Sequence, residues 1–259
     1  MRVLVTGADG FIGRRVMHML RVRGDEPVPF DLPDSVLDAD AVETAALSCD
    51  ACVHLAAHKY ATSAEDEPAA VTELNVQGTA NVVAAFGSGV VLASTCKAAD
   101  AMTVYGASKL IAERVVLNAG GVVVRFVNVV GSTGSVAQIW DRVPAGEPLP
   151  VMPCSRMWMS VVMAARLIVD GLDRPSGRYA PMVAPPEPVA ELADRLHPGR
   201  PVMLLPPRRG DRVRERLVAE EETSMPVAPG VIRISHPADR TVEEPVVFAG
   251  RNGRREAAA

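Results

Sequence analysis

Short apolar runs alternate with longer amphipathic stretches over the first half of the chain. Five runs have the length and content of buried strands, at residues 3–5, 28–31, 51–56, 90–93 and 122–127. Between them, apolar residues recur at helical spacing through Val16 to Leu20 and over residues 73–86 and 105–117. This alternation predicts an α/β protein with a doubly wound parallel sheet that helices cover on both faces.

The pattern changes after Gly131. Prolines at positions 144, 148, 150 and 153 interrupt the chain, and the helices expected near Met163 and Glu187 are separated by loops. We therefore expect a first domain at residues 1–130 and a smaller, less regular C-terminal cap at 131–240. The last stretch, 241–259, is expected to be a flexible tail.

Three glycines mark the turn between the first strand and the first helix. Gly7, Gly10 and Gly13 are spaced three and three. In a strand–turn–helix unit, such glycines let the backbone turn tightly and approach a pyrophosphate, which the N–H groups of the helix then bind. We expect a Rossmann-type NAD(P)-binding domain whose loop also includes Asp9, Phe11 and Ile12.

Asp31 ends the second expected strand. A carboxylate there can accept hydrogen bonds from the adenosine ribose and repels a 2′-phosphate, which favours NAD over NADP. Arg14 and Arg15 follow the glycines and could serve a 2′-phosphate, so NADP remains an alternative. Asp38 is expected either to contact the adenine or to cap a helix that begins at Ala39.

Tyr105 and Lys109 are spaced i and i+4 at the start of an expected helix, so their side chains share one helix face. An ammonium beside the phenol favours phenolate and lowers the tyrosine pKa, which suits a general base for a substrate hydroxyl. Thr95 ends the preceding strand, where it can hydrogen-bond the same hydroxyl. Cys96 and Lys97 follow it and are expected near the reacting carbons.

Composition excludes several other classes. The net charge of −4 provides no basic field for nucleic acid or an anionic membrane, and no apolar segment is long enough for a bilayer span. Cys49 and Cys52 form a C-x-x-C, but without a second pair or suitably spaced histidines they are interpreted as small apolar residues. No metal site is expected, and four cysteines in 259 residues suit a reducing cytoplasm.

Several motifs carry a family resemblance. Residues 6–13, H-L-A-A at 54–57, N-V-Q-G-T at 75–79 and Y-G-A-S-K at 105–109 resemble the extended short-chain dehydrogenases/reductases. A narrower set is similar to the UDP-N-acetylglucosamine 4,6-dehydratase group of polysaccharide biosynthesis, the CapD-like proteins. It comprises S-T-C-K-A at 94–98, R-F-V-N-V-V-G-S at 125–132, S-R-M-W-M-S at 155–160 and R-R-G-D at 208–211 with Glu215 after it. The likeness is collinear from residue 1 to about 235 and implies an NAD(P)-dependent enzyme acting on a nucleotide sugar, with a UDP-hexosamine expected.

The resemblance also implies roles for individual residues. Tyr105 would deprotonate the sugar 4-hydroxyl as hydride leaves C4, Lys97 would remove the C5 proton, and water would leave from C6 before the hydride returns. The cofactor would lie against Leu55, Ala56, Ala57 and Asn75 as well as Tyr105, Lys109 and the glycine loop. The nucleotide sugar would be bound by Lys59, Asn128, Ser135, Arg156, Arg208 and Asp211, with the arginines facing its diphosphate.

One position departs from the family pattern. Where the family reads T-D-K, this chain has Cys96 in place of the aspartic acid that protonates the leaving hydroxyl. A thiol is protonated at neutral pH, so Cys96 is either the proton donor or a small residue packed at the strand end. The change leaves open 4,6-dehydration, 5,6-dehydration with hydride returned to C4, and 4- or 5-epimerisation. A non-catalytic dinucleotide-binding regulator is disfavoured because Thr95, Tyr105 and Lys109 are all present.

The helices expected at 73–86 and 105–117 carry apolar residues on more than one face. Members of the resembled family pair these helices between subunits. We therefore expect a cytoplasmic homodimer or larger even assembly, with no nucleic-acid or membrane partner.

Overall fold

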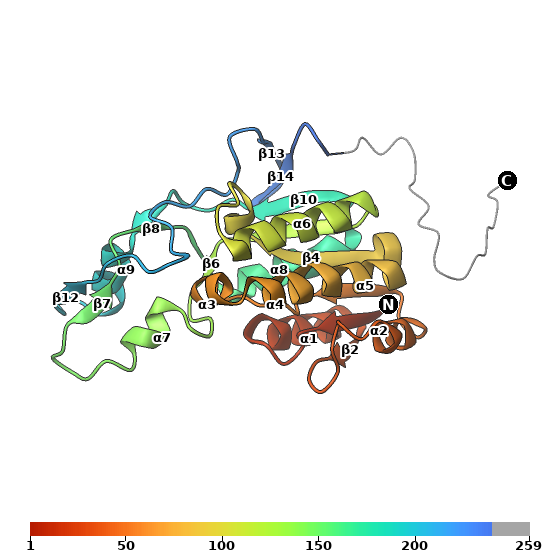
Figure 1. Cartoon of the computed structure of the whole chain (residues 1–259), viewed down its shortest axis with the longest axis horizontal. Coiled ribbons are helices and arrows are strands. Elements are labelled where there is room, and N and C mark those ends of the chain that lie inside the picture. Colours follow the sequence, from red (N-terminus) through yellow and green to blue (C-terminus); the bar gives the residue numbers. More distant parts are fainter. Residues whose placement is uncertain (240–259) are drawn as a thin grey trace.

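An eight-stranded sheet forms the centre of the computed structural model, which describes residues 1–239 (Figure 1). Its strands are β1 (Arg2–Thr6), β2 (Glu26–Phe30), β3 (Ala51–His54), β4 (Val90–Thr95), β5 (Val122–Phe126), β10 (Gly177–Pro181), β13 (Thr223–Ala228) and β14 (Val231–Ser235). In space they follow the order β13–β14–β10–β5–β4–β3–β1–β2. All neighbours from β2 to β10 are parallel, and β14 and β13 extend the sheet antiparallel. The expected Rossmann-type sheet is therefore confirmed.

Helices cover both faces of this sheet. On one face α1 (Phe11–Arg23) packs against α8 (Val161–Asp170), and on the other lie α2 (Ala39–Ala46), α5 (Gly78–Phe86) and α6 (Val104–Asn118). Side chains alternate along β1, so Val3 and Val5 join the core beneath α1 and α8 while Leu4 joins the core beneath α5 and α6. The continuous apolar runs of the sequence thus belong to strands buried on both faces.

The strand order places the ligand-binding crevice. β2 lies on one side of β1 and β3 on the other, so the order in which strands are added to the sheet reverses at β1. Ligands bind outside the carboxyl ends of the strands at such a switch point. Residues 31–38 form only turns between β2 and α2, so no further strand lies outside β2 among the described residues. The loops after β1, β3, β4 and β5 therefore surround the candidate site.

A smaller unit lies beyond the carboxyl ends of the strands, on the left of Figure 1. It contains α7 (Val136–Trp140), α9 (Val189–Leu196) and two short sheets, β7 (Leu149–Val151) with β12 (Val202–Leu204) and β8 (Ser155–Arg156) with β11 (Glu187–Pro188). Trp140, Leu149 and Leu192 are fully buried in a core of its own. β6 (Asn128–Val129) pairs with β9 (Trp158–Met159) where this cap joins the main sheet.

The expected division at residue 130 is wrong in one respect. After building most of the cap, the chain returns to the large unit, where α8 packs on α1 and β10, β14 and β13 complete the sheet. The G-R-Y-A-P sequence of β10 has no apolar run that would predict a buried strand. Its Arg178 is nevertheless buried, in an ion pair with Glu113. The expected tail at 241–259 lies outside the described residues.

The helical region before β4 is also more divided than expected. Instead of one helix over 73–86, the chain forms α3 (Ala61–Asp66), α4 (Pro68–Thr72), a π turn η1 (Glu73–Gln77) and then α5. Short 3-10 turns follow as η2 (Gly87–Gly89), η3 (Cys96–Ala98) and η4 (Gly171–Asp173). π turns inside helices are frequent at functional sites, and this one carries Asn75.

Candidate active site

The loop between β1 and α1 has the shape of a phosphate cradle. Gly7 has a φ of 69°, and a Cβ added to it would lie 2.9 Å from the backbone nitrogen of Ala56. A Cβ on Gly13 would lie 2.1 Å from the Gly7 carbonyl oxygen, so neither position accepts a side chain. Gly10 caps α1 without a side-chain acceptor, which leaves the first N–H groups of a 13-residue helix for a ligand. These features fit the pyrophosphate of a dinucleotide.

Residues 55–57 form the opposite wall of the crevice, after β3. The Thr6 hydroxyl accepts the N–H groups of Leu55 and Ala56 at 3.1 and 3.2 Å, which fixes this loop against β1. Asn75, which is 1% exposed, bonds the backbone of the same loop and donates to Ser108 Oγ at 2.9 Å. The π turn therefore connects the cofactor crevice to α6.

Asp31 and Asp38 differ in position. Asp31 Oδ2 accepts the backbone N–H of Asp9 at 2.9 Å, so this carboxylate lies at the mouth of the glycine loop, where a ribose would be expected. Asp38 accepts the N–H of Ala41 at 3.0 Å and caps α2. Of its two expected roles, the structure therefore shows the helix cap.

The first turn of α6 approaches the end of β4 closely. Thr103 caps the helix by accepting the N–H of Gly106 at 3.1 Å. A Cβ on Gly106 would lie 2.4 Å from the Lys97 carbonyl oxygen, so glycine allows α6 to pack against η3. This packing brings Tyr105 beside Thr95 and Lys97.

The expected electrostatics of Tyr105 are wrong in direction. Burial raises the pKa of Tyr105, and this outweighs the opposing effects of the Lys97 ammonium and the Thr95 hydroxyl. Lys97 is the cation that lowers the pKa of Tyr105 most. Burial lowers the pKa of Lys109 to about 8, although the Glu113 carboxylate acts in the opposite sense.

Cys96, which was expected near the reacting carbons, is buried at the end of β4. Cys96 is 0% exposed and belongs to the main core, and its Sγ lies 3.5 Å from Oε2 of Glu215. Burial raises the pKa of its thiol to about 11. This burial favours the small packed residue that the sequence left as an alternative, and a role of Cys96 as proton donor is untested.

A buried carboxylate that the sequence did not single out stands at the centre of the site. Glu215 Oε1 lies 2.7 Å from Lys97 Nζ and 3.4 Å from Arg156 Nε, and Oε2 accepts the amide of Asn128 at 2.7 Å. Burial alone would raise the pKa of Glu215, but Lys97 and Arg156 hold it below its usual value. The only sequence signal for Glu215 was its place after the R-R-G-D motif.

The ion pair with Glu215 also shifts the pKa of Lys97. Burial alone would lower its pKa, but the Glu215 carboxylate outweighs burial and holds the pKa of Lys97 above its usual value. The expected residues Lys97, Asn128 and Arg156 thus converge on one carboxylate.

Four other expected sugar-binding residues make local contacts instead. Lys59 is exposed, with Nζ 5.3 Å from the centre of the Tyr60 ring. Ser135 caps α7, and Arg208 Nε lies 3.1 Å from Asp211 Oδ2. Their roles toward a substrate remain predictions.

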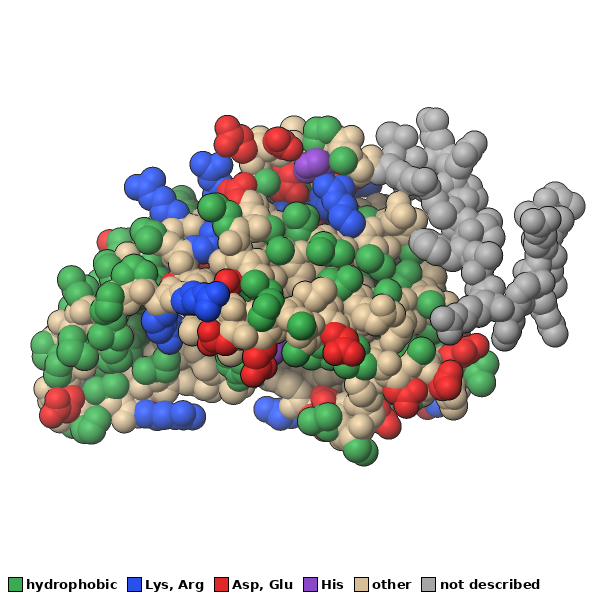
Figure 2. All heavy atoms as spheres, in the orientation of Figure 1, with side chains coloured by type: hydrophobic (Ala, Val, Ile, Leu, Met, Phe, Trp, Pro, Cys, Tyr) green, Lys and Arg blue, Asp and Glu red, His purple; other side chains and the backbone are tan. Residues whose placement is uncertain are grey.

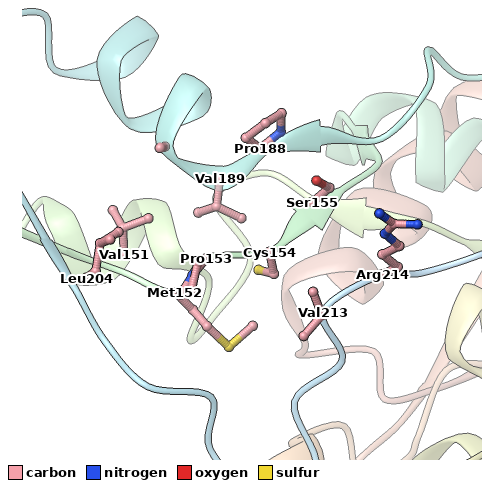
Figure 3. Close-up of a pocket in the computed structure, with 11 residues that line it drawn as sticks. Val151, Met152, Pro153, Cys154, Ser155, Pro188, Val189, Leu204, Val213 and Arg214 are labelled. Carbon is pink, nitrogen blue, oxygen red and sulfur yellow. The ribbon is translucent and has the colours of Figure 1, made fainter.

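A cavity of about 350 Å³ opens in the cap next to this cluster (Figure 3). The Cys154 side chain points into it between Val189 and Val213, and Arg214 lies at its edge. Figure 2 shows hydrophobic side chains gathered over this end of the molecule, where Met203 and Leu204 of β12 are exposed. Ser155 lines the cavity, and the next residue of β8, Arg156, contacts Glu215 with Nε 3.4 Å from Oε1.

Comparison with known proteins identifies relatives of the chain. Residues 27–235 match the Polysacc_synt_2 family, described as polysaccharide biosynthesis protein. A UDP-N-acetylglucosamine 4,6-dehydratase (inverting) of Campylobacter jejuni is 26% identical over 209 residues, which cover 73% of this chain. The matched region covers 62% of that relative, so the chain spans less than two thirds of its length.

Solved structures share the fold. Pen from Bacillus thuringiensis is 22% identical, with a TM-score of 0.78 over 92% of this chain and 89% of that protein. TunA, an NAD-dependent NDP-hexosamine 5,6-dehydratase of tunicamycin biosynthesis, is 22% identical, with a TM-score of 0.71 over 83% of this chain and 87% of its own. None of the helices within residues 1–239 is both long and apolar enough to cross a bilayer.

Proposed function

Because the chain belongs to the polysaccharide biosynthesis protein family, we propose that it is an NAD-dependent nucleotide-sugar dehydratase acting on a UDP-hexosamine such as UDP-N-acetylglucosamine. The observation that carries the proposal is the meeting of Thr95, Tyr105 and Lys97 at the carboxyl end of β4. This cluster lies in the crevice whose glycine loop fits a dinucleotide pyrophosphate.

The first step is oxidation of the sugar at C4. A bound nicotinamide cofactor would accept hydride from C4 and later return it to the sugar. The Thr95 hydroxyl orients the C4 hydroxyl, and Tyr105 takes its proton in the phenolate form. Asp31 at the mouth of the loop favours NAD as the cofactor.

The second step is loss of water. The 4-ketone acidifies the proton on C5, which the free amine of Lys97 removes. The resulting ammonium passes that proton to the C6 hydroxyl as the C6–O bond breaks, the C5–C6 double bond forms and water leaves. Because one nitrogen takes and delivers the proton, the step needs no acid at position 96, where the thiol is buried.

The cap holds the rest of the substrate in this proposal. Arg156 and Asn128 line the approach to Lys97, and the neighbouring cavity has room for the nucleotide. An exposed guanidinium suits a diphosphate better than a lysine, because its planar fork donates two parallel hydrogen bonds. Arg214 lines the cavity, and Arg208 is the exposed guanidinium that the family resemblance assigns to the diphosphate.

A second candidate is an NAD-dependent nucleotide-sugar 4-epimerase. The buried thiol at position 96 is compatible with it, because epimerisation needs only Thr95, Tyr105 and Lys109 and no proton donor for a leaving hydroxyl. Incubation of the purified protein with a panel of nucleotide sugars tests both. Loss of the mass of one water supports the dehydratase, and an unchanged mass with inverted C4 stereochemistry supports the epimerase.

A further inference from the structure

The chain uses lysine very sparingly. Of its 27 lysines and arginines, only Lys59, Lys97 and Lys109 are lysines. Arginine keeps its charge at every working pH, whereas a lysine can lose its proton. Each of these three lysines has a shifted pKa, and that of Lys97 alone is raised.

The carboxylate of Glu215, which pairs with Lys97, has neighbours at both of its oxygens. Its Oε1 faces Lys97 at 2.7 Å and Arg156 at 3.4 Å, while its Oε2 contacts the Asn128 amide at 2.7 Å and the Cys96 thiol at 3.5 Å. The Glu215 side chain is 0% exposed, whereas that of Lys97 is 19% exposed. A substrate can therefore reach Lys97 but not Glu215.

We propose that Glu215 is a positioning residue that holds the Lys97 amine at the sugar and sets the pH at which this amine becomes a free base. The assignment of the base to C5 rests on the proposed function, but the control of Lys97 by Glu215 does not.

The charged and titratable groups around Lys97 determine whether loss of the Glu215 carboxylate raises or lowers the pKa of Lys97. Arg156 of β8 is a like charge, Cys96 and Cys154 are protonated thiols at neutral pH, and Tyr105 of α6 is a neutral phenol. Glu215 is then the only carboxylate in contact with Lys97 among the described residues. A glutamine at position 215 keeps the shape but leaves Lys97 beside Arg156 without a counter-charge, so the pKa of Lys97 falls and the free amine forms at lower pH.

The small number of lysines makes a direct test feasible. Protein labelled with ¹³C at lysine Cε gives three NMR signals, which Lys59→Arg and Lys97→Arg assign. In the parent protein the Lys97 signal should titrate at the highest pH of the three. In Glu215→Gln it should move to lower pH, and Glu215→Asp should restore part of the difference.

Glu220→Gln is the matched control, because it removes a carboxylate that is 87% exposed from the same segment. It should leave the Lys97 titration unchanged. A Lys97 signal that titrates before Lys59 in the parent, or that does not respond to Glu215→Gln, would overturn the proposal. The order of titration in the parent decides the question by itself if Glu215→Gln does not fold.

The pH profile of C5 proton exchange gives a second readout. With UDP-N-acetylglucosamine in deuterated buffer, Glu215→Gln should shift the rise of the exchange rate to lower pH and lower its plateau on the order of tenfold. An unshifted profile would overturn the positioning role. If no sugar reacts while the NMR signal moves as expected, the proposed function fails and the control of Lys97 by Glu215 stands.

Discussion

The Sγ atom of Cys96 lies 3.5 Å from Oε2 of Glu215, on the buried side of the end of β4. We predict that Cys96→Ala keeps the rate of water elimination near that of the parent, because the thiol cannot touch the sugar. Its cost is in packing, on the order of 1 kcal/mol in the free energy of unfolding by urea. A rate loss of about 10²- to 10⁴-fold in folded protein would instead identify Cys96 as the general acid.

The cofactor preference depends on Asp31. Calorimetric titration of cofactor-stripped protein should show NAD binding more tightly than NADP, because the Asp31 carboxylate repels a 2′-phosphate. Asp31→Asn can still accept the Asp9 N–H and should reduce the ratio of the two Kd values on the order of tenfold. Asp34→Asn, in the same turn, is the control. Tighter NADP binding by the parent would show that Arg14 or Arg15 decides the choice.

The outer face of α6 predicts self-association. Ile111 lies in the middle of this helix and is 48% exposed. We expect a homodimer or a larger even assembly, and Ile111→Asp should shift it to monomer in light scattering because a charge would be buried in the interface. Val22→Asp, at an exposed position on α1, should not. A parent mass of 27.4 kDa at micromolar concentration would contradict the prediction.

His54 predicts a dependence of stability on pH. It is 1% exposed between the Thr6 and Thr79 hydroxyls, and burial lowers its pKa to about 3. The unfolded chain takes up this proton near pH 6.5 while the folded protein does not, so stability rises with pH from about 3 to 6.5. Urea unfolding should lose on the order of 2 kcal/mol between pH 7 and pH 5 through this residue. An equal loss in His54→Gln would show that other groups cause it.

Local features of the sequence were enough to predict the parallel sheet and the glycine-rich turn between β1 and α1. Gly7 and Gly13 sit between an apolar run and an amphipathic stretch, and the close approach of Gly13 is to the backbone of Gly7 and Ala8 in the same turn. Tyr105 was placed correctly on the first turn of a helix for the same reason, since its capping residue Thr103 and Gly106 are its neighbours. The glycine turn and the start of α6 are both predicted by the spacing of residues within one short segment.

Contacts between distant segments were not predictable in this way. Glu215 lies 119 residues from Cys96 in the chain and belongs to no helix or strand. No hydrophobic periodicity therefore predicts its contact with Lys97. Likewise β10 joins the sheet with Arg178 buried against Glu113 of α6, and an arginine in a short strand has no apolar signal. Whether the pKa of Tyr105 is raised or lowered depends on burial, which the i, i+4 spacing of Tyr105 and Lys109 does not determine.

The mass of the product made from UDP-N-acetylglucosamine in deuterated water tests the central claim most directly. If Lys97 removes the C5 proton and water leaves from C6, the 4,6-dehydrated product returned to ordinary water should lack the mass of one water and carry one deuterium at C5. Tyr105→Phe should yield no product, because no ketone forms. A product of unchanged mass, or a dehydrated product formed equally well by Lys97→Ala, would contradict the account.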